Sequence, residues 1–489
     1  MKEIASWALE TARVRGASLA EARIVDERNR ALATKSGKIG AASDSESLGI
    51  GIRVIANGAF GFAATDELSR EAVEACAAKA VEIAKASATV KASELHMLPE
   101  PPAKAEWCSP CKIDPFTIPI EKNLELLFAI DEELRKVKGV TLAEASMNFR
   151  RYEQWFFSTE GADIHQIITT SGAGYTAHSF EGSEIQKRSY PNSFGGQFQN
   201  KGYELIEELR LLERAQETAE AAVALHSAEQ CPEGTFDIIL DSSQLALQIH
   251  ESVGHPIELD RVLGMEANFA GTSFLTLDKL RTLKYGSEIV NVVADATEAH
   301  GPGLGTFAYD DEGVAAQRTP IITNGLFTGY LTSRDTAGAI GANRSGGCLR
   351  AEGWNRLPIV RMTNVSILPC EPPLTLEQLI ASTERGIFME TNRSWSIDDK
   401  RYNFQFGCEV GWEIAGGKRK RMLKNPLYSG ITTEFWNSMD AICSRDDWTL
   451  WGIPNCGKGQ PQQVMGTGHG AAPARFRNIS VGTAYKGSD

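Results

Sequence analysis

The stretch IGIRVIANGAFGFAAT, residues 50–65, determines the fold class of the region around it. Apolar residues alternate on both sides of Asn57-Gly58, and this dipeptide supplies the positive φ angles of a tight hairpin turn. The next residues, DELSREAVEACAAKAVEIAKASA at 66–88, repeat apolar side chains at helical spacing. A hairpin followed directly by a long helix predicts an α+β fold.

Outward from this stretch, the chain divides into three predicted parts. A proline-rich loop at 97–119 and the segment AEQCPEGT at 228–235 mark the two boundaries. We predict an N-terminal α+β domain over residues 1–110 and a middle α+β segment over 111–229 that closes with a long helix near 203–227. Residues 230–489 are predicted to form a C-terminal domain that is mostly antiparallel β, with a second hairpin at Asn324-Gly325 and a capped helix starting at Thr375.

The composition of the 489 residues is that of a folded soluble protein, with 42% hydrophobic and 23% charged residues. A formal charge of −13 argues against a nucleic-acid-binding surface, because a phosphate backbone demands clustered Lys and Arg. We find no apolar run long enough for a signal peptide or a membrane span, so we expect a cytoplasmic location without membrane contact. The nine cysteines fit reduced thiols, and the lone CxxC of Cys108 and Cys111 is a weak metal or redox signal.

A candidate metal site lies in LQIHESVGHPIELD, residues 247–260, which follows the strand pattern FDIILD and a helix start at Asp241. His250 and His255 are five residues apart, so on a straight helix they would point about 140° away from each other. Gly254 leaves helical geometry easily and Pro256 disfavours a helical His255, so we expect the helix to end or distort at Gly254 and return His255 toward His250.

The residues beside the two histidines suggest hydrolytic chemistry. Glu251 is placed to accept a proton from a water at the metal, and zinc requires a third protein ligand with a fourth position left open. Glu258, Asp260 or a distant cysteine could be that ligand, and the local spacing does not choose among them. The competing interpretation is a core histidine, a loop histidine and a surface charge, because the pattern has only three fixed positions.

Five separated blocks, in order, resemble the TldD/PmbA family. They are GIGIRVIANGAFGFAAT, HESVGHPIELD, YDDEGVAAQRTPIITNGLFTGYLTSRDTA, RMTNVSILPCE and NCGKGQPQQVMGTGHGAAPARFRNISVGTA. The resemblance implies a zinc-dependent peptidase of the TldD branch, whose C-terminal part, here residues 230–489, is the metallopeptidase domain. It further implies that His250, His255 and Cys456 bind Zn²⁺ and that Glu251 is the general base. One thiolate with two neutral imidazoles would leave the zinc site with a net charge of about +1.

The resemblance also implies unfolded or flexible peptides as substrates and a homologous TldE/PmbA-type subunit as partner in a heterodimer, with a homodimer as the other possibility. Two departures from the family pattern are Pro256 after the second histidine and His469 in the tail block, which is a candidate fourth ligand or a neutral loop histidine. The competing functions are a non-catalytic zinc-binding structural subunit of a protein-processing complex and a zinc hydrolase that acts on another amide.

Overall fold

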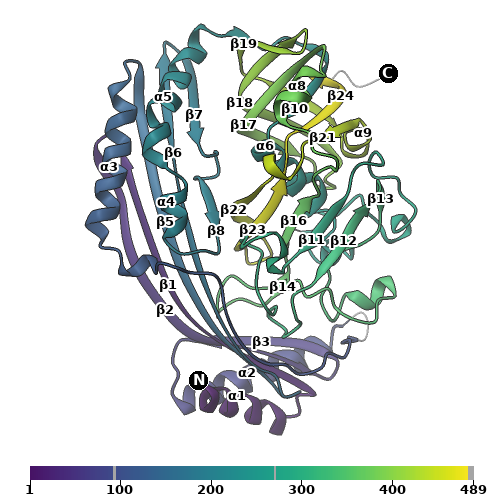
Figure 1. Cartoon of the computed structure of the whole chain (residues 1–489). Helices are drawn as coiled ribbons and strands as arrows, with labels where there is room; N and C mark the ends of the chain where they lie inside the picture. Colours follow the sequence, from purple (N-terminus) through teal and green to yellow (C-terminus); the bar gives the residue numbers. More distant parts are fainter. Residues whose placement is uncertain (92–94, 269–270, 483–489) are drawn as a thin grey trace.

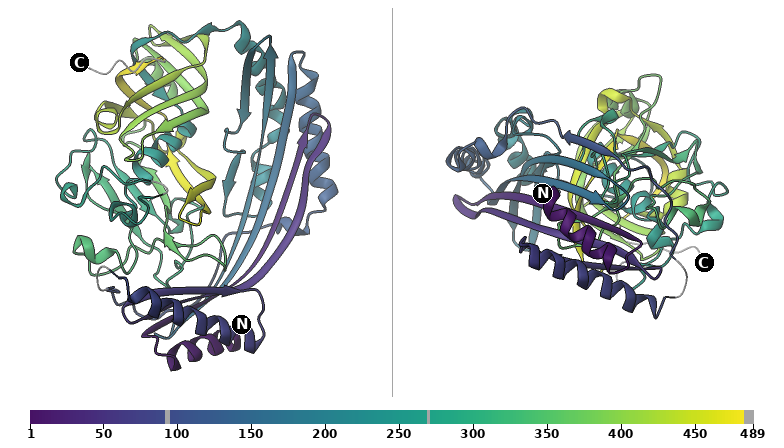
Figure 2. Two further views of the ribbon diagram at one scale, coloured as in Figure 1. Left: turned by 180° about the vertical axis from the view of Figure 1, so that it is seen from behind. Right: turned by 90° about the horizontal axis from the view of Figure 1, so that it is seen from below.

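The computed structural model describes residues 1–91, 95–268 and 271–482 and confirms the predicted α+β fold. A long curved sheet runs along one side of the molecule, and the mostly β C-terminal half lies beside it (Figure 1). Figure 2 shows the same two parts from behind and from below. Within the described residues, no helix has both the length and the apolar content needed to cross a membrane.

The curved sheet takes its strands from both of the first two predicted segments. Its order is β3-β2-β1-β5-β6-β4, and β7 and β8 also pair with β6. Four of these strands have 17 to 19 residues, and every pairing except that of β4 with β6 is antiparallel. The strands are β1 (Leu19–Lys35), β2 (Lys38–Ala56), β3 (Ala59–Thr65), β4 (Lys104–Cys108), β5 (Val140–Ser158), β6 (Asp163–Glu181), β7 (Glu184–Tyr190) and β8 (Gln197–Gln199).

Helices bury the two ends of this sheet. At one end α1 (Lys2–Val14) and α2 (Arg70–Ala88) pack small side chains against β1 and β2, in a core that includes Ala8, Ala80 and Ile52. At the other end α3 (Ile120–Lys136) and α5 (Ala215–Ala224) pack against β5 and β6. The middle part of the sheet is left to face the C-terminal half.

The C-terminal half contains two larger sheets. The first has the order β17-β10-β24-β20-β18-β19-β9, and an additional pairing of β17 with β18 closes five of its strands into a ring, with β21 on β24. These strands are β9 (Glu229–Gln230), β10 (Gly234–Leu240), β17 (Arg385–Ile397), β18 (Asn403–Ala415), β19 (Lys418–Lys424), β20 (Leu427–Ile431), β21 (Met439–Ile442) and β24 (Ala474–Val481).

The second sheet, of order β13-β12-β11-β16-β23-β22, carries the C-terminal cysteine block. Its strands are β11 (Val292–Asp295), β12 (Arg318–Thr323), β13 (Leu326–Phe327), β16 (Asn364–Ile367), β22 (Thr449–Lys458) and β23 (Gln463–Ala471). A short pair, β14 (Leu349–Arg350) and β15 (Ile359–Val360), lies nearby. The short helices are α4 (Glu204–Glu208), α6 (Ser242–Ile249), α7 (Leu259–Val262), α8 (Leu376–Ala381) and α9 (Thr432–Asn437).

Local sequence signals were good guides to the turns and caps. Asn57 and Gly58 have φ of 54° and 73°, and Asn324 and Gly325 have 48° and 77°, as tight hairpins require. Thr375 forms the predicted capping box. The single long helix predicted near 203–227 is wrong: Arg210 takes a φ of 48°, and the chain there forms two short α-helices with a 3₁₀ turn between them.

Buried charge pairs join the curved sheet to the C-terminal half. Arg23 Nη1 lies 3.1 Å from a carboxylate oxygen of Asp311. Arg53 lies between Glu21, at 2.5 Å, and Glu312, at 3.3 Å. Because burying an unpaired charge is costly, these pairs favour the observed docking of the two parts over any arrangement that would separate the partners.

Candidate metal centre

The HExxxH motif sits at the end of a strand-to-helix unit, as the sequence predicted. β10 leads into α6, and the Asp241 side chain caps the helix by accepting hydrogen bonds from the backbone N–H groups of Ser243 and Gln244. All residues of α6 after Ser242 are buried. The motif is therefore delivered into the interior of the C-terminal half.

The helix does not break at the motif but widens. Residues His250–Gly254 form a π-helical turn, in which the His255 N–H donates to the His250 carbonyl oxygen at 3.1 Å. This hydrogen bond spans five residues, which matches the spacing of the two histidines and brings their rings to 4.8 Å between centroids. The predicted distortion, which returns His255 toward His250, is confirmed, but the helix does not end at Gly254: His255 keeps helical angles of −66° and −42° despite Pro256.

Contacts from other elements hold this widened turn. A Cβ at position 254 would lie 2.1 Å from Met362 Sδ, so Gly254 is needed for a close approach and not as a helix breaker. The Tyr285 hydroxyl donates to the Ser252 carbonyl oxygen, and Trp436 Nε1 donates to the Ser252 hydroxyl at 2.9 Å. The Tyr285 bond satisfies the Ser252 carbonyl oxygen, which has no donor four residues on because Pro256 lacks an N–H.

Cys456 reaches the two histidines from β22. It pairs with Met465 of β23 just after an irregularity in the strand pairing that starts at Ile453. One potential ligand atom from each of Cys456, His250 and His255 lies within 4.8 Å of the others, and Cys456 Sγ is 3.7 Å from His255 Nε2. All three side chains are buried. The structure thus brings together the three residues that the resemblance implied as ligands.

His469 orients the His250 ring through its Nδ1 atom. Its Nδ1 is 3.0 Å from the Val365 carbonyl oxygen, which only accepts, so Nδ1 carries the proton. In a neutral His469, Nε2 then accepts from His250 Nδ1 at 2.8 Å. We infer that His250 Nε2 keeps a free lone pair for a metal, and that His469, with both nitrogens engaged, is not a fourth ligand.

Glu258 orients His255 in the same manner. A Glu258 carboxylate oxygen lies 3.0 Å from His255 Nδ1, which therefore donates and leaves the Nε2 lone pair toward Cys456. Lys458 Nζ lies 3.4 Å from the other Glu258 oxygen and 2.7 and 2.8 Å from the two oxygens of Asp260. The Glu258 carboxylate thus binds His255 and Lys458, and the Asp260 carboxylate binds Lys458. Neither belongs to the cluster of potential ligand atoms.

The protonation states suit a metal. Burial lowers the pKa of His250 to about 4 and that of His255 well below its ordinary value, so both rings are neutral at pH 7. Burial alone would raise the pKa of the Cys456 thiol, but the charge of Arg361 and the interaction with His255 bring it below its usual value. Arg361 is fully buried and donates to the Cys456 carbonyl oxygen at 2.6 Å. Neutral imidazoles and a favoured thiolate are the forms that bind zinc.

Glu251 lies beside this cluster on the π-helical turn and forms an ion pair with Arg401. Arg401 belongs to the turn between β17 and β18 and adopts a φ of 65°, which is uncommon for a residue with a side chain. The Glu251 side chain is 8% exposed, so it keeps a small opening toward solvent. The turn at Arg401 therefore fixes the orientation of the carboxylate.

Comparison with known proteins agrees with this geometry. Residues 233–483 match the model of the PmbA/TldA metallopeptidase C-terminal domain, and residues 20–84 match that of PmbA/TldA metallopeptidase domain 1. A metalloprotease of Methanocaldococcus jannaschii is 31% identical over 453 residues, which cover 92% of this chain and 94% of the relative. The chain belongs to the TldD/PmbA family.

Other members of the TldD/PmbA family extend this comparison. A zinc metalloprotease TldD homologue of Saccharolobus solfataricus is 26% identical over 250 residues, which cover 51% of this chain and 52% of that protein. TldE of Thermococcus kodakarensis has a similar structure, with a TM-score of 0.73 at 16% sequence identity, covering 98% of this chain and all of the other. At this identity the structural likeness shows the fold alone.

Three arginines and one lysine around the site were missed as functional candidates. Arg361 and Lys458 belong to the sequence blocks RMTNVSILPCE and NCGKGQ. Nothing in these blocks predicted that the two charged side chains would be buried. Arg350, in β14, and Arg401, in the turn between β17 and β18, lie outside the quoted blocks. Cys108 and Cys111 are exposed free thiols, and among the residues that the structure describes neither joins a cluster of metal-binding side chains.

The orientation of His255 leads to a first prediction. Replacing Glu258 by glutamine should lower zinc affinity by about 10- to 100-fold, because the amide is a weaker acceptor for the His255 N–H and leaves Lys458 with fewer negative neighbours. Zinc competition against a chelating dye measures this. The control is Glu390→Gln, a half-buried glutamate whose bond to Trp412 lies outside the site. Unchanged affinity in Glu258→Gln would contradict the assigned role of Glu258.

Proposed function

We propose that this protein is a zinc-dependent peptidase of the TldD type that hydrolyses unfolded or flexible peptides. The observation that carries the proposal is the buried cluster of His250, His255 and Cys456, whose ligand atoms lie within 4.8 Å of one another. Two imidazole nitrogens and one thiolate fit zinc in both chemistry and number, with a fourth position left for water or substrate. The engagement of His469 elsewhere supports an open fourth position.

The chemistry follows from the residues beside the cluster. A bound zinc ion would polarise the scissile carbonyl and acidify a water molecule. Glu251 would take a proton from the attacking water and return it to the leaving amine, and its ion pair with Arg401 holds the carboxylate in place. Glu258 and His469 hold the two imidazoles in the tautomers that leave each Nε2 with a free lone pair, so these residues would hold a zinc ion.

Access to the site supports a flexible substrate. The cluster is buried inside the C-terminal half, so a peptide bond in a folded protein would be held away from it, which favours an extended peptide as substrate. We propose that the chain acts together with a homologous TldE-type subunit, or with a second copy of itself, to enclose the site. The resemblance of the five sequence blocks to the TldD/PmbA family supports such pairing.

One observation favours a second candidate, a zinc-binding subunit without peptidase activity. Glu251 is ion-paired with Arg401, so its carboxylate is already engaged before any substrate arrives. In that case the metal would stabilise the domain, and a partner subunit would hydrolyse the peptide.

Metal removal tests the proposed function. The purified protein should cleave an unstructured peptide, lose nearly all cleavage after a chelator strips the metal, and regain it on addition of zinc but not of magnesium, because the donor set includes sulfur. Mass spectrometry of the peptide fragments measures cleavage. A folded protein of similar sequence length should stay intact. Cleavage that survives chelation would contradict the proposal.

A further inference from the structure

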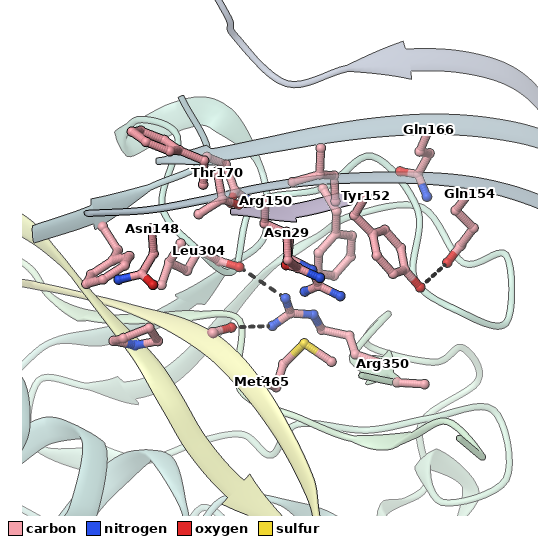
Figure 3. A pocket seen from close by; sticks show the side chains of 18 of the residues that line it. Asn29, Asn148, Arg150, Tyr152, Gln154, Gln166, Thr170, Leu304, Arg350 and Met465 are labelled. Carbon is pink, nitrogen blue, oxygen red and sulfur yellow. Dashed lines mark hydrogen bonds between the residues drawn. The ribbon is translucent and has the colours of Figure 1, made fainter. Parts of the chain in front are cut away.

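A cavity of about 450 Å³ lies between the curved sheet and the C-terminal half (Figure 3). Strands β1, β5, β6 and β8 form one wall, and residues of β14, β22 and β23 with nearby loops form the other. Its size suits a few residues of an extended peptide. The metal cluster itself does not line it, and the proposed chemistry does not use it.

The guanidinium of Arg350 projects into this cavity (Figure 3). Backbone carbonyls hold it: Nη1 donates to Met362 at 2.9 Å and Gly466 at 3.0 Å, and Nη2 donates to Leu304 at 3.0 Å. Within the described ranges, no carboxylate forms an ion pair with Arg350. Asp311, which also lines the cavity, accepts from Arg23 and from the backbone N–H of Ala351 through its Oδ2.

The surroundings of Arg350 make the cavity positive. Burial, together with the charges of Arg361 and Arg150, lowers the pKa of Arg350 to about 10, so it remains charged at pH 7. Arg150 also lines the cavity, and its charge is balanced by Glu27 at 2.9 Å. Arg350 is half-buried and its charge is met by carbonyl oxygens alone, an environment that favours a ligand carrying a carboxylate.

Amide side chains beside the arginines add neutral hydrogen-bonding groups. Asn148 lies two residues before Arg150 on β5, so both side chains face the same side of the sheet. Among the described residues, no hydrogen bond engages the Asn148 amide. Asn29, directly across from Arg150 on β1, also lines the cavity. The cavity therefore offers two cations and at least one free amide on facing walls.

Backbone contacts place this cavity next to the metal cluster. Met465 lines the cavity and is the cross-strand partner of Cys456, so the two side chains share one face of the β22–β23 hairpin. Arg361 donates to the Cys456 carbonyl oxygen, and the next residue, Met362, accepts from Arg350. Arg350 is thus linked through Met362 and Arg361 to the backbone that carries Cys456.

We propose that this cavity binds a carboxylate of the peptide substrate, with Arg350 as the main binding group and Arg150 as the second. The inference rests on the proposed peptidase function and specifies its substrate class: peptides with a carboxylate a few residues from the bond that is cut. The carboxylate comes either from the peptide C-terminus or from an Asp or Glu side chain.

Binding of labelled peptides to the zinc-loaded Glu251→Gln protein tests the proposal without relying on turnover. Three fluorescent peptides are compared by anisotropy: an unstructured hexapeptide without acidic side chains and with a free C-terminus, its C-terminal amide, and the amide with one Asp. We expect the free acid, the Asp-containing amide, or both to bind about 10- to 100-fold more tightly than the plain amide, as for a charge-assisted hydrogen bond. The pattern identifies the source of the carboxylate.

Arginine variants locate the binding group. Arg350→Met and Arg150→Met should each reduce the preference for carboxylate peptides, with the larger loss at Arg350, and Arg350→Lys should retain part of it. Since Arg350 also holds three carbonyls, each variant is first checked for unchanged circular dichroism and zinc content, and Arg150→Met provides the test if Arg350→Met does not fold. Arg344→Met, an exposed arginine paired with Glu100 away from the cavity, is the matched control.

Different results would reject the carboxylate-binding site and the peptidase function. Equal binding of all three peptides, or an undiminished preference in both Arg350→Met and Arg150→Met, overturns the carboxylate site even if the native protein cleaves peptides. A carboxylate preference that depends on these arginines supports the site even if the native protein cleaves none of them, a result that would reject the peptidase function alone.

Discussion

Glu251→Gln is expected to reduce peptide hydrolysis by at least about 100-fold while leaving zinc bound. The amide has nearly the same shape as the carboxylate but accepts no proton, and Glu251 is not among the clustered ligand residues. Zinc content should therefore stay near that of the unmodified protein. Cleavage of an unstructured peptide, followed by mass spectrometry, together with elemental analysis of the same sample, measures both quantities.

The ion pair with Arg401 makes a second variant informative. Arg401→Gln removes the partner of Glu251 but keeps the carboxylate, so hydrolysis should fall less than in Glu251→Gln. Glu390→Gln serves again as a control outside the site. If Glu251→Gln cleaves peptides at the unmodified rate, Glu251 is not the general base. If no form of the chain cleaves peptides although all bind zinc, the non-catalytic subunit is the better account.

Cys456→Ser is expected to lose most of its zinc and, with it, nearly all peptidase activity. A serine hydroxyl does not ionise at neutral pH, so the site would keep two neutral imidazoles and lose its only anionic donor. The drop in zinc affinity should exceed the roughly 10- to 100-fold expected for a residue that only orients a ligand, such as Glu258. Elemental analysis and chelator competition measure it.

A second buried thiol provides a control for the loss of folding stability that replacing a buried cysteine by serine causes. Cys443 is fully buried and lies outside the metal cluster, so Cys443→Ser should destabilise the protein to a comparable degree while retaining zinc. Zinc binding that persists in Cys456→Ser but is lost in His255→Ala and Glu258→Gln would show that the third ligand is not the cysteine. Thermal unfolding of each variant with and without zinc separates folding defects from metal loss.

Local elements of this fold were predictable because their causes are local. The positive φ angles at Asn57-Gly58 and Asn324-Gly325 and the capping box at Thr375 depend on a few neighbouring residues, and the structure contains all of them. The pairing of β1 with β5 was not predictable. It joins residues more than 100 positions apart, and a one-residue shift in register would exchange the faces of both strands.

The geometry of the HExxxH motif depends on contacts that local sequence does not reveal. The five-residue spacing of His250 and His255 was recognised as incompatible with an ordinary helix, but a broken helix and a widened helix both relieve that conflict. The choice depends on Met362, Tyr285 and Trp436, which pack on the turn from distant parts of the chain. These tertiary contacts fit the π-helical turn, because Met362 fills the space beside Gly254 and Tyr285 donates to the Ser252 carbonyl oxygen.

From the sequence alone came the α+β class, the hairpins, and the residues with the chemistry to bind a metal. Only the tertiary structure decided that Glu258 and His469 bind the Nδ1 atoms of the two histidines and that Asp260 binds Lys458. It also placed Arg350 in its cavity and brought Cys456 to histidines some 200 residues away. The division has a simple physical reason. Spacing along the chain controls local hydrogen bonds, whereas the position of a side chain in the interior depends on the register of strands paired across the whole fold.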